Sequence, residues 1–278
     1  MKKAWDTNVG LFGMTLHYTY MDAKDVNPAQ ASFVSANYGT PATFDRNGRA
    51  LSNSDFLVKN RVNGTLDWSK DLFGDNMTRV SMFFEYRSGR PFSYTMREGI
   101  FPPSSVCGGN RAFAQFDSQL MYVPTMGDPN VIFSNTPGSL SNDSALEASF
   151  NSFVAVAGLE GFRGQITPRN HDTTSSRSRV NIRIQQEISL FDIPAIGQSR
   201  LNLYLDIENL GNLLNDDWGR VEQVSFPFSF TAVDSVSLNT NGQYVYGSID
   251  DFWDGINPEN FYALPSVYKI QVGFKFEF

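Results

Sequence analysis

Hydrophobic and polar residues alternate along several stretches of the chain. The last stretch shows this most clearly, because every second residue is apolar and the residues between are polar, charged or glycine. The apolar positions there are Tyr268, Ile270, Val272, Phe274, Phe276 and Phe278. Successive side chains of a β-strand point to opposite faces of the sheet, so this pattern predicts a strand with one apolar face.

Five earlier stretches have the same pattern, so the sequence predicts about six amphipathic strands. Each is about 10 residues long or more, which suffices to cross the hydrocarbon layer of a bilayer when the strand is tilted. The apolar positions are Phe12, Met14, Leu16, Tyr18 and Tyr20; Val58, Val62, Leu66 and Trp68; Val80, Met82, Phe84 and Tyr86; Val180, Ile182, Ile184, Ile188 and Leu190; and Leu201, Leu203, Leu205 and Ile207. A strand in a soluble β-sandwich alternates in the same way, so the period alone leaves open whether these faces contact lipid or a protein core.

The connections between the predicted strands alternate between short and long. Residues 70–76 and 191–198 form the short ones, and residues 23–55, 91–176 and 211–263 form the long ones. Outer-membrane barrels have short periplasmic turns and long extracellular loops, whereas a compact soluble domain rarely contains a connection as long as residues 91–176. If Phe278 ends its strand on the periplasmic side, both short turns fall on that side. The sequence therefore predicts an all-β fold, a portion of an antiparallel transmembrane β-barrel with long extracellular loops.

Two of the long connections contain predicted structure of their own. Residues 144–147, Ser-Ala-Leu-Glu, form a capping box, and apolar residues follow it at helical spacing. These apolar residues are Leu146, Phe150, Phe153 and Val154. Gly158 fits the C-terminal end of this one short loop helix. Residues 219–230 and 242–249 predict two further strands that form an extracellular hairpin.

Composition and charge narrow the function classes. Charged residues make up 18% of the chain, below the roughly 25% that is usual in soluble domains, and aromatic residues make up 14%. A formal charge of -7 without a cluster of Lys and Arg argues against nucleic acid as a partner. Residues 1–6 begin like a signal peptide but no apolar segment follows, so we expect the chain to be a fragment whose export signal lies upstream.

Few residues suggest catalysis or metal binding. His17 and His171 are the only histidines and lack the spacing of zinc ligands, and the single cysteine, Cys107, cannot form an internal disulfide. We therefore predict no cofactor and no metal site.

Several acidic residues are candidate metal ligands or candidate catalytic acids. The candidates for Ca²⁺ are Asp216, Asp217, Asp250, Asp251 and Asp254, but the spacing of an EF-hand is absent. Asp206 and Glu208 are paired acids of the kind that glycosidases use, yet acids two residues apart on a strand face are common by accident. We expect that the chain is not an enzyme.

Charged residues gather on the polar faces of the predicted strands. In a barrel these faces line the lumen, and the lumen-facing candidates are Glu85, Arg87, Arg183, Glu187, Asp206 and Glu208. The favoured interpretation is a ladder of charges that hydrates the wall and contacts a plug domain. Contact with a substrate is the second interpretation.

Several motifs resemble the Oar-like branch of the TonB-dependent outer-membrane receptors. They lie at residues 72–75 (LFGD), 79–94 (RVSMFFEYRSGRPFSY), 164–170 (GQITPRN), 183–187 (RIQQE) and 205–215 (LDIENLGNLLN). The last strand, from Tyr268 to Phe278, resembles the terminal aromatic signal that the barrel-assembly machinery reads. Together these motifs are spread over residues 72–278, in the order of the family's C-terminal end.

The resemblance implies a location in the outer membrane of a Gram-negative bacterium and TonB-dependent uptake of a large nutrient. The implied partners are outer-membrane lipid, the barrel-assembly machinery, the receptor's own plug domain, and the TonB complex through an N-terminal part that this sequence lacks. Family barrels have 22 strands, and about six cannot close one. Residues 1–278 are therefore expected to be the C-terminal segment of such a barrel, without signal peptide, TonB box or plug domain.

Two alternatives stay open. The chain could be a complete small porin or adhesin of about eight strands. It could also be a soluble β-rich carbohydrate-binding protein or glycosidase, in which Phe274, Phe276 and Phe278 would pack on a second sheet.

Overall fold

A long sheet of seven strands dominates the structure. The computed structural model describes residues 1–278 except 30–31, 46, 99–118, 194–196 and 248–259. The long sheet has the strand order β1-β2-β5-β6-β13-β14-β19, and every neighbouring pair in it is antiparallel. Its strands are β1 (Lys2–Thr7), β2 (Gly10–Tyr20), β5 (Asn60–Phe73), β6 (Asn76–Arg87), β13 (Arg177–Ile193), β14 (Gly197–Glu208) and β19 (Lys269–Glu277). The sheet is open, with β1 and β19 at its two edges.

The register of the long sheet keeps apolar residues opposite apolar residues. Phe12 lies opposite Trp68, and Leu205 lies opposite both Ile184 and Val272. Because side chains alternate between faces, a slip of one residue would move apolar side chains to the polar face. The predicted all-β, antiparallel fold class with long loops is confirmed.

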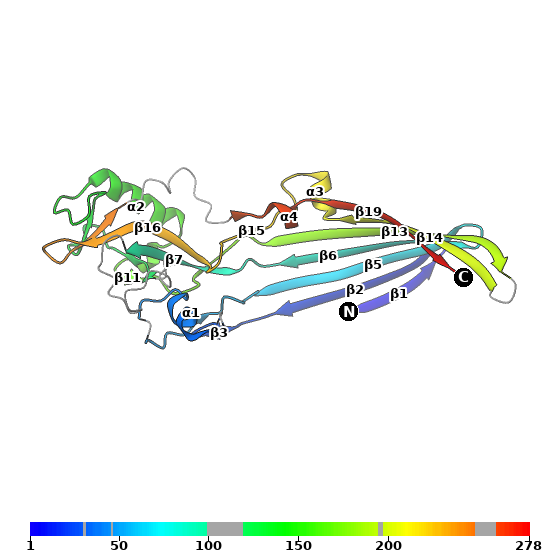
Figure 1. Cartoon of the computed structure of the whole chain (residues 1–278), viewed down its shortest axis with the longest axis horizontal. Helices are drawn as coiled ribbons and strands as arrows, with labels where there is room; N and C mark the ends of the chain where they lie inside the picture. The colour runs from blue at the N-terminus through cyan, green and yellow to red at the C-terminus, as the bar shows by residue number, and fades with distance from the viewer. Residues whose placement is uncertain (30–31, 46, 99–118, 194–196, 248–259) are drawn as a thin grey trace.

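Short and long connections leave opposite ends of the long sheet. The chain turns from β1 to β2 and from β5 to β6 through two residues each. Three long connections, residues 21–59, 88–176 and 209–268, leave the other end, and we call them together the loop region. Figure 1 shows most of this region at the left and the short turns at the right. The alternation predicted from the sequence is therefore present.

One strand of the long sheet is missing from the prediction. Residues 2–7 form β1, which pairs along its whole length with β2, whereas the sequence suggested only a rudimentary signal peptide there. The strand is short and Trp5 is its only large apolar residue, so its sequence shows almost no alternation of apolar and polar positions. Trp5 nevertheless lies on the apolar face, stacked on Phe12 with ring centroids 5.9 Å apart.

The loop region has its own sheet and helix. A six-stranded mixed sheet has the order β10-β17-β16-β7-β12, with β8 paired to β7. Its strands are β7 (Pro91–Glu98), β8 (Gln119–Leu120), β10 (Val131–Phe133), β12 (Asp172–Thr173), β16 (Ser229–Leu238) and β17 (Tyr244–Gly247). Helix α2 (Ser144–Val156) packs on this sheet through Phe150, whose ring centroid lies 5.3 Å from that of Phe133 and 5.9 Å from that of Tyr246.

Shorter elements complete the loop region. They are β3 (Lys24–Asp25), β4 (Ser52–Asn53), β9 (Tyr122–Val123), β11 (Gln165–Ile166), β15 (Glu222–Gln223), β18 (Asn260–Phe261), α1 (Val34–Gly39), the 3₁₀ helix η1 (Glu160–Phe162), α3 (Leu210–Leu214) and α4 (Ala263–Ser266). The sequence predicted only one helix, and these short helices lack the periodicity that would reveal them. Among the residues described, no helix has both the length and the apolar content to cross a bilayer.

The predicted loop helix is confirmed, with one correction at its start. Asp143 rather than Ser144 is the N-cap, because its carboxylate accepts hydrogen bonds from the backbone N–H groups of Ala145 and Leu146. Gly158 follows the helix with φ 68°, as the sequence predicted.

The predicted hairpin is present, but its first strand was placed too early. Residues 219–230 contain only the two-residue β15 and the start of β16, which pairs with β17. Proline has no N–H for a ladder, and Phe228 has φ 65°, so extended pairing begins only at Ser229. Residues 248 and 249 of the predicted second strand lie outside the described residues.

Candidate functional site

The two faces of the long sheet differ in chemistry. One face, here the apolar face, carries large hydrophobic side chains that no described element covers. Val272 is 77% exposed and Phe274 is 72% exposed. Other exposed members of this face are Leu16, Tyr18, Tyr20, Leu66, Tyr86, Ile184, Leu203, Ile270 and Phe276. The sandwich alternative required Phe274 to pack on a second sheet, and it does not do so among the described residues.

Aromatic residues lie toward both ends of the apolar face. Tyr18, Tyr20 and Tyr86 lie near the end from which the long connections leave, and Trp5, Phe12 and Trp68 lie near the short turns. The indole Nε1 of Trp68 donates a hydrogen bond to the backbone oxygen of Val9 in the first turn, at 2.9 Å. The two sets of aromatic residues thus lie where the apolar face meets the polar connections at either end of the sheet.

Several polar residues on the apolar face have hydrogen-bond partners. Thr78 of β6 lies opposite Gln186 of β13, and its hydroxyl donates a hydrogen bond to Gln186 Oε1 at 2.5 Å. Lys70, opposite Thr78 on the other side, directs its ammonium group to the backbone oxygen of Asn8 in the first turn, at 3.1 Å. These groups therefore add little unsatisfied polarity to the face.

The opposite face, here the polar face, carries all six charged residues that the sequence singled out. Five of them form ion pairs across neighbouring strands. The pairs are Arg61–Glu85 at 2.5 Å, Arg183–Asp206 at 2.5 Å, Arg179–Glu208 at 2.9 Å and Arg200–Glu187 at 3.1 Å. A ladder of ion pairs therefore runs across this face and engages five of the six residues. Its expected roles, hydration of a barrel wall and contact with a plug domain, stay predictions.

Arg87 is the exception among the six. It lies opposite Arg61 on one side and Arg177 on the other, and none of the ion pairs among the described residues includes it. Sequence reasoning missed Arg61 and Arg177, because their proximity to Arg87 depends on strand register. Only the pairing order and register of β5, β6 and β13 bring the three arginines to the same level of the sheet.

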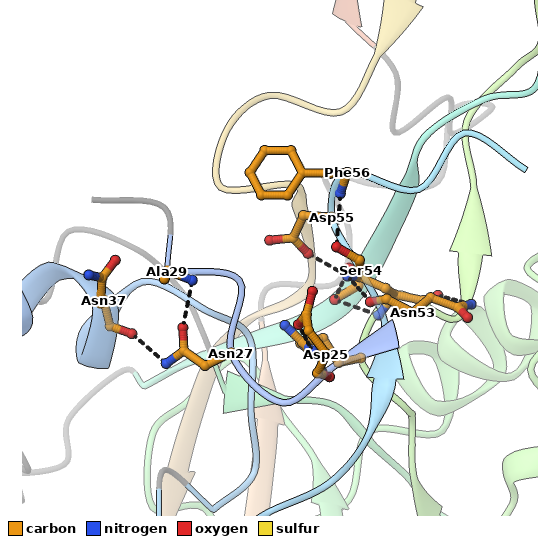
Figure 2. Close-up of polar contacts among 11 residues, drawn as sticks. Asp25, Asn27, Ala29, Asn37, Asn53, Ser54, Asp55 and Phe56 are labelled. Atoms are coloured by element: carbon orange, nitrogen blue, oxygen red, sulfur yellow. Dashed lines mark hydrogen bonds and ion pairs between the residues drawn. The ribbon is translucent and has the colours of Figure 1, made fainter. Parts of the chain in front are cut away.

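The motif at residues 164–170 contacts another part of the loop region, residues 25–55. Arg169, only 6% exposed, donates hydrogen bonds from Nη2 to the backbone oxygen and to Oδ1 of Asp25, both at 2.6 Å. Asn170 and Asn53 exchange side-chain to backbone hydrogen bonds of 2.7 and 3.0 Å, and Asn170 Nδ2 also donates to Asp55. The residues around Asp25, Asn53 and Asp55 are drawn in Figure 2.

These contacts tie two long connections together. Asn170 also binds β7, since its backbone N–H donates to Ser93 Oγ at 2.9 Å and its Oδ1 accepts from that hydroxyl at 3.1 Å. Asn27 closes the neighbouring turn, accepting from the N–H of Ala29 and donating to the backbone oxygen of Asn37 (Figure 2). These hydrogen bonds hold the loops in place, although Arg169 Nη1 is buried without an acceptor among the described residues.

Two tyrosine–carboxylate pairs further fix the loop region. Tyr94 donates to Asp172 Oδ2 at 2.7 Å, and burial together with this carboxylate raises the pKa of the phenol. Tyr122 donates to Asp128 Oδ2 at 2.7 Å, and this hydrogen bond, with some burial, raises the pKa of Tyr122 to about 12. Both carboxylates serve as hydrogen-bond acceptors for their own loops.

Comparisons with known protein families, characterised proteins and solved structures gave no match. Any function assigned to the chain therefore rests on its own residues and geometry.

Those candidate metal ligands that the structure describes are not brought together. Among the described residues, no group of three or more His, Cys, Asp or Glu is placed to hold a metal ion. His17 lies on the polar face opposite Asn63, and the ring of His171 lies edge-on to Phe162, with centroids 4.5 Å apart. Asp217 forms an ion pair with Arg220 at 2.9 Å. Cys107, Asp250, Asp251 and Asp254 lie outside the described residues.

Proposed function

We propose that the long sheet is part of the wall of an outer-membrane β-barrel, with its apolar face on lipid and its polar face toward the lumen. In this proposal the loop region is extracellular and the short turns are periplasmic. The motifs that resemble Oar-like TonB-dependent receptors extend the proposal to uptake of a large nutrient with energy from the TonB complex. The plug domain and the barrel-assembly machinery would be the protein partners.

The position of the buried core carries the proposal. Every residue of the buried hydrophobic cluster belongs to the loop region, and no hydrophobic residue of the long sheet is buried among the described residues. A sheet with one apolar face is stable only where that face is covered by another layer. The hydrocarbon of a bilayer supplies such a layer, so lipid accounts for a face that the described protein leaves bare.

The dimensions of the apolar face also support a bilayer. Along β13 the apolar positions run from Val180 to Leu190, about 33 Å at the usual strand rise. At a tilt of about 40° this run has a height of about 25 Å, which is the height of the apolar band of outer-membrane barrels. The aromatic residues near both ends of the face are placed like the girdles of such barrels.

Insertion of the 278-residue chain into liposomes tests the lipid-facing assignment. We expect the refolded chain to float with liposomes in a density gradient. Val272→Arg, on the apolar face, should weaken insertion by about 2–4 kcal/mol if this position lies near the middle of the bilayer. Gln271→Arg changes the neighbouring residue on the polar face and should float like the unmodified chain.

Two results would contradict the proposal. One is a chain that stays folded and monodisperse in water without detergent or lipid; sugar binding by that soluble material would favour the carbohydrate-binding alternative. The other concerns the receptor class, because an upstream coding sequence without a TonB box and plug domain would exclude it while leaving the barrel wall intact.

A further inference from the structure

A pocket lies where the long sheet meets the loop region. It has a volume of about 370 Å³ and is lined by three segments, residues 87–90, 174–178 and 217–223. The first two are the links from β6 to β7 and from β12 to β13, and the third follows α3. Residues 88–90 carry the chain directly from the long sheet to the sheet of the loop region.

The pocket is rich in arginine although the chain as a whole is acidic. Four arginines line it, Arg87, Arg90, Arg177 and Arg220, against two carboxylates, Asp217 and Glu222. The whole chain has a formal charge of -7. Only Arg220 of the four has a carboxylate partner among the ion pairs of the described residues, namely Asp217.

Strand register places like charges opposite each other at the pocket. Arg177 lies directly opposite Arg87, and Arg87 lies directly opposite Arg61 of β5. Like charges in this relation destabilise a sheet. Arg177 Nε is also buried without a hydrogen-bond acceptor among the described residues, which costs free energy as long as no acceptor arrives.

The backbone around the arginines is closely packed. A side-chain carbon at Gly89 would lie 1.7 Å from the backbone oxygen of Thr174, so only glycine allows the two links to approach each other this closely. The N–H of Arg90 donates to Thr174 Oγ1 at 2.9 Å, and the guanidinium of Arg90 lies 5.6 Å from the centre of the Phe228 ring. The links that carry three of the arginines are thus held in position before any ligand binds.

We propose that this pocket binds an oxyanion, a phosphate or sulfate group, between Arg87 and Arg177. Guanidinium groups suit such anions because their planar N–H donors match two oxygens at once. An oxyanion there offsets the repulsion between the two arginines and offers an acceptor to Arg177 Nε. The exposed Trp218 also lines the pocket, so an organic group attached to the anion meets an apolar residue.

Anion binding in this pocket does not depend on the assignment of the apolar face to lipid. If the bound anion is part of an incoming nutrient, the pocket would capture that nutrient, and this role alone rests on the proposed function. Failure of anion binding by a chain that still floats with liposomes would remove the pocket alone.

Calorimetric titration of the detergent-solubilised full chain with pyrophosphate at low ionic strength tests the site. The double variant Arg87→Gln/Arg177→Gln should weaken binding by at least about tenfold, since it removes two charged donors. Arg79→Gln is the matched control, because Arg79 lies on the same face of β6, outside the pocket and outside the ion pairs of the described residues. This control should bind as the unmodified chain does.

A measurement of stability shows whether the double variant still folds. Without pyrophosphate it should be at least as stable as the unmodified chain, because a like-charge pair is removed. Equal affinity of the double variant and the unmodified chain would overturn the proposal. So would absence of binding by an unmodified chain whose circular dichroism shows intact β-structure.

The source of the anion is distinguished by a second titrant. Micelles doped with phosphatidic acid present the same phosphate as a lipid headgroup. If the chain binds pyrophosphate more tightly than the micelles, and the double variant loses this binding, the ligand is soluble. If the chain binds the micelles more tightly, and the double variant loses that binding, the ligand is a lipid headgroup. Micelle binding that persists in the double variant would show that the headgroup binds elsewhere and count against the pocket.

Discussion

Tyr204 of β14 lies directly opposite Gly273 of β19, and its ring occupies the space above the glycine. A side-chain carbon at position 273 would lie 2.3 Å from the tyrosine Oη. The guanidinium of Arg183 stands 5.2 Å from the centre of the same ring. A glycine covered by a cross-strand aromatic residue is a known device for stabilising sheets, so these three residues link β13, β14 and β19 on the polar face.

Gly273→Ala should destabilise the chain, because the new methyl group and the Tyr204 ring cannot share this space. Displacing the ring should reduce the free energy of unfolding by about 1–3 kcal/mol. Urea unfolding in detergent micelles measures the change. Gly13→Ala is the control, since a side-chain carbon there has ordinary contact with Asp67 at 3.7 Å. Adding Tyr204→Ala to Gly273→Ala should cost less than the sum of the single changes, and full additivity would contradict the argument.

The sequence predicts the strands of the long sheet where alternation is strong and misses them where it is weak. Ile270 to Phe276 give a near-perfect period of two, which only a strand explains. In β1 the corresponding positions are Lys3, Trp5 and Thr7, too polar to stand out. Some strands of the loop region are too short or too completely buried to show an alternation of apolar and polar residues. One is β10, Val131–Phe133, whose three residues are all buried.

The candidate site could be predicted only in part. Alternation assigns Glu85, Arg87 and Arg183 to one face, because a residue's face follows from its parity along the strand. It does not give the partner of each charge, which depends on the order and register of strands far apart in the sequence. The arginine pocket needs Arg87 beside Arg177, and that contact arises only after the intervening loop region has folded.

Asn170→Asp should unfold part of the loop region at neutral pH. Asn170 has φ 56°, a conformation that Asp also tolerates, so the effect comes from the amide donor. Nδ2 of Asn170 donates to the Asp55 carboxylate and to the backbone oxygen of Asn53. A carboxylate in place of this donor would repel Asp55, and we expect a loss of about 2–4 kcal/mol in the free energy of unfolding.

The pH dependence of this variant gives a sharper test. Like-charge repulsion raises the folded-state pKa of one carboxyl above its unfolded value, so the destabilisation should shrink as the pH falls through that pKa. Thermal unfolding at several pH values checks this. Asn170→Ala, which introduces no charge, should lose stability without that recovery, and parallel pH profiles for the two variants would refute the mechanism.

Asp143→Ala should destabilise helix α2, because it removes the acceptor of two backbone N–H groups. The loss of an N-cap costs about 1 kcal/mol. Ser144→Ala is the control, since no side-chain hydrogen bond from Ser144 caps the helix described here. Hydrogen exchange of the amides of Ala145 and Leu146 should accelerate in Asp143→Ala alone. Equal acceleration in both variants would restore Ser144 as the cap that the sequence suggested.

Tyr122→Phe should alter the stability of the loop region at both ends of the pH scale. Burial opposes ionisation of Asp128, but the Tyr122 hydroxyl and the N–H groups of Thr125 and Asn130 outweigh it and lower the pKa of the carboxyl below its usual value of 3.8. A lowered pKa means stability that is present above the unfolded pKa and lost as the pH falls through the folded one. The raised pKa of Tyr122, about 12, means stability that is present below the usual phenol pKa of 10.0 and lost as the pH rises through about 12.

The loss of stability in acid and the loss in alkali both depend on the Tyr122 hydroxyl. In Tyr122→Phe we expect the pKa of Asp128 to rise and the loss of stability in alkali to become smaller, because no phenol remains to ionise at this position. Carboxyl chemical shifts followed by NMR report the first effect, and thermal unfolding between neutral and alkaline pH reports the second. Tyr262→Phe is the control, since the Tyr262 hydroxyl contacts the Ser225 hydroxyl at 3.3 Å rather than a carboxylate. An Asp128 pKa that is the same in Tyr122→Phe and in the unmodified chain would show that the backbone N–H groups alone hold it low.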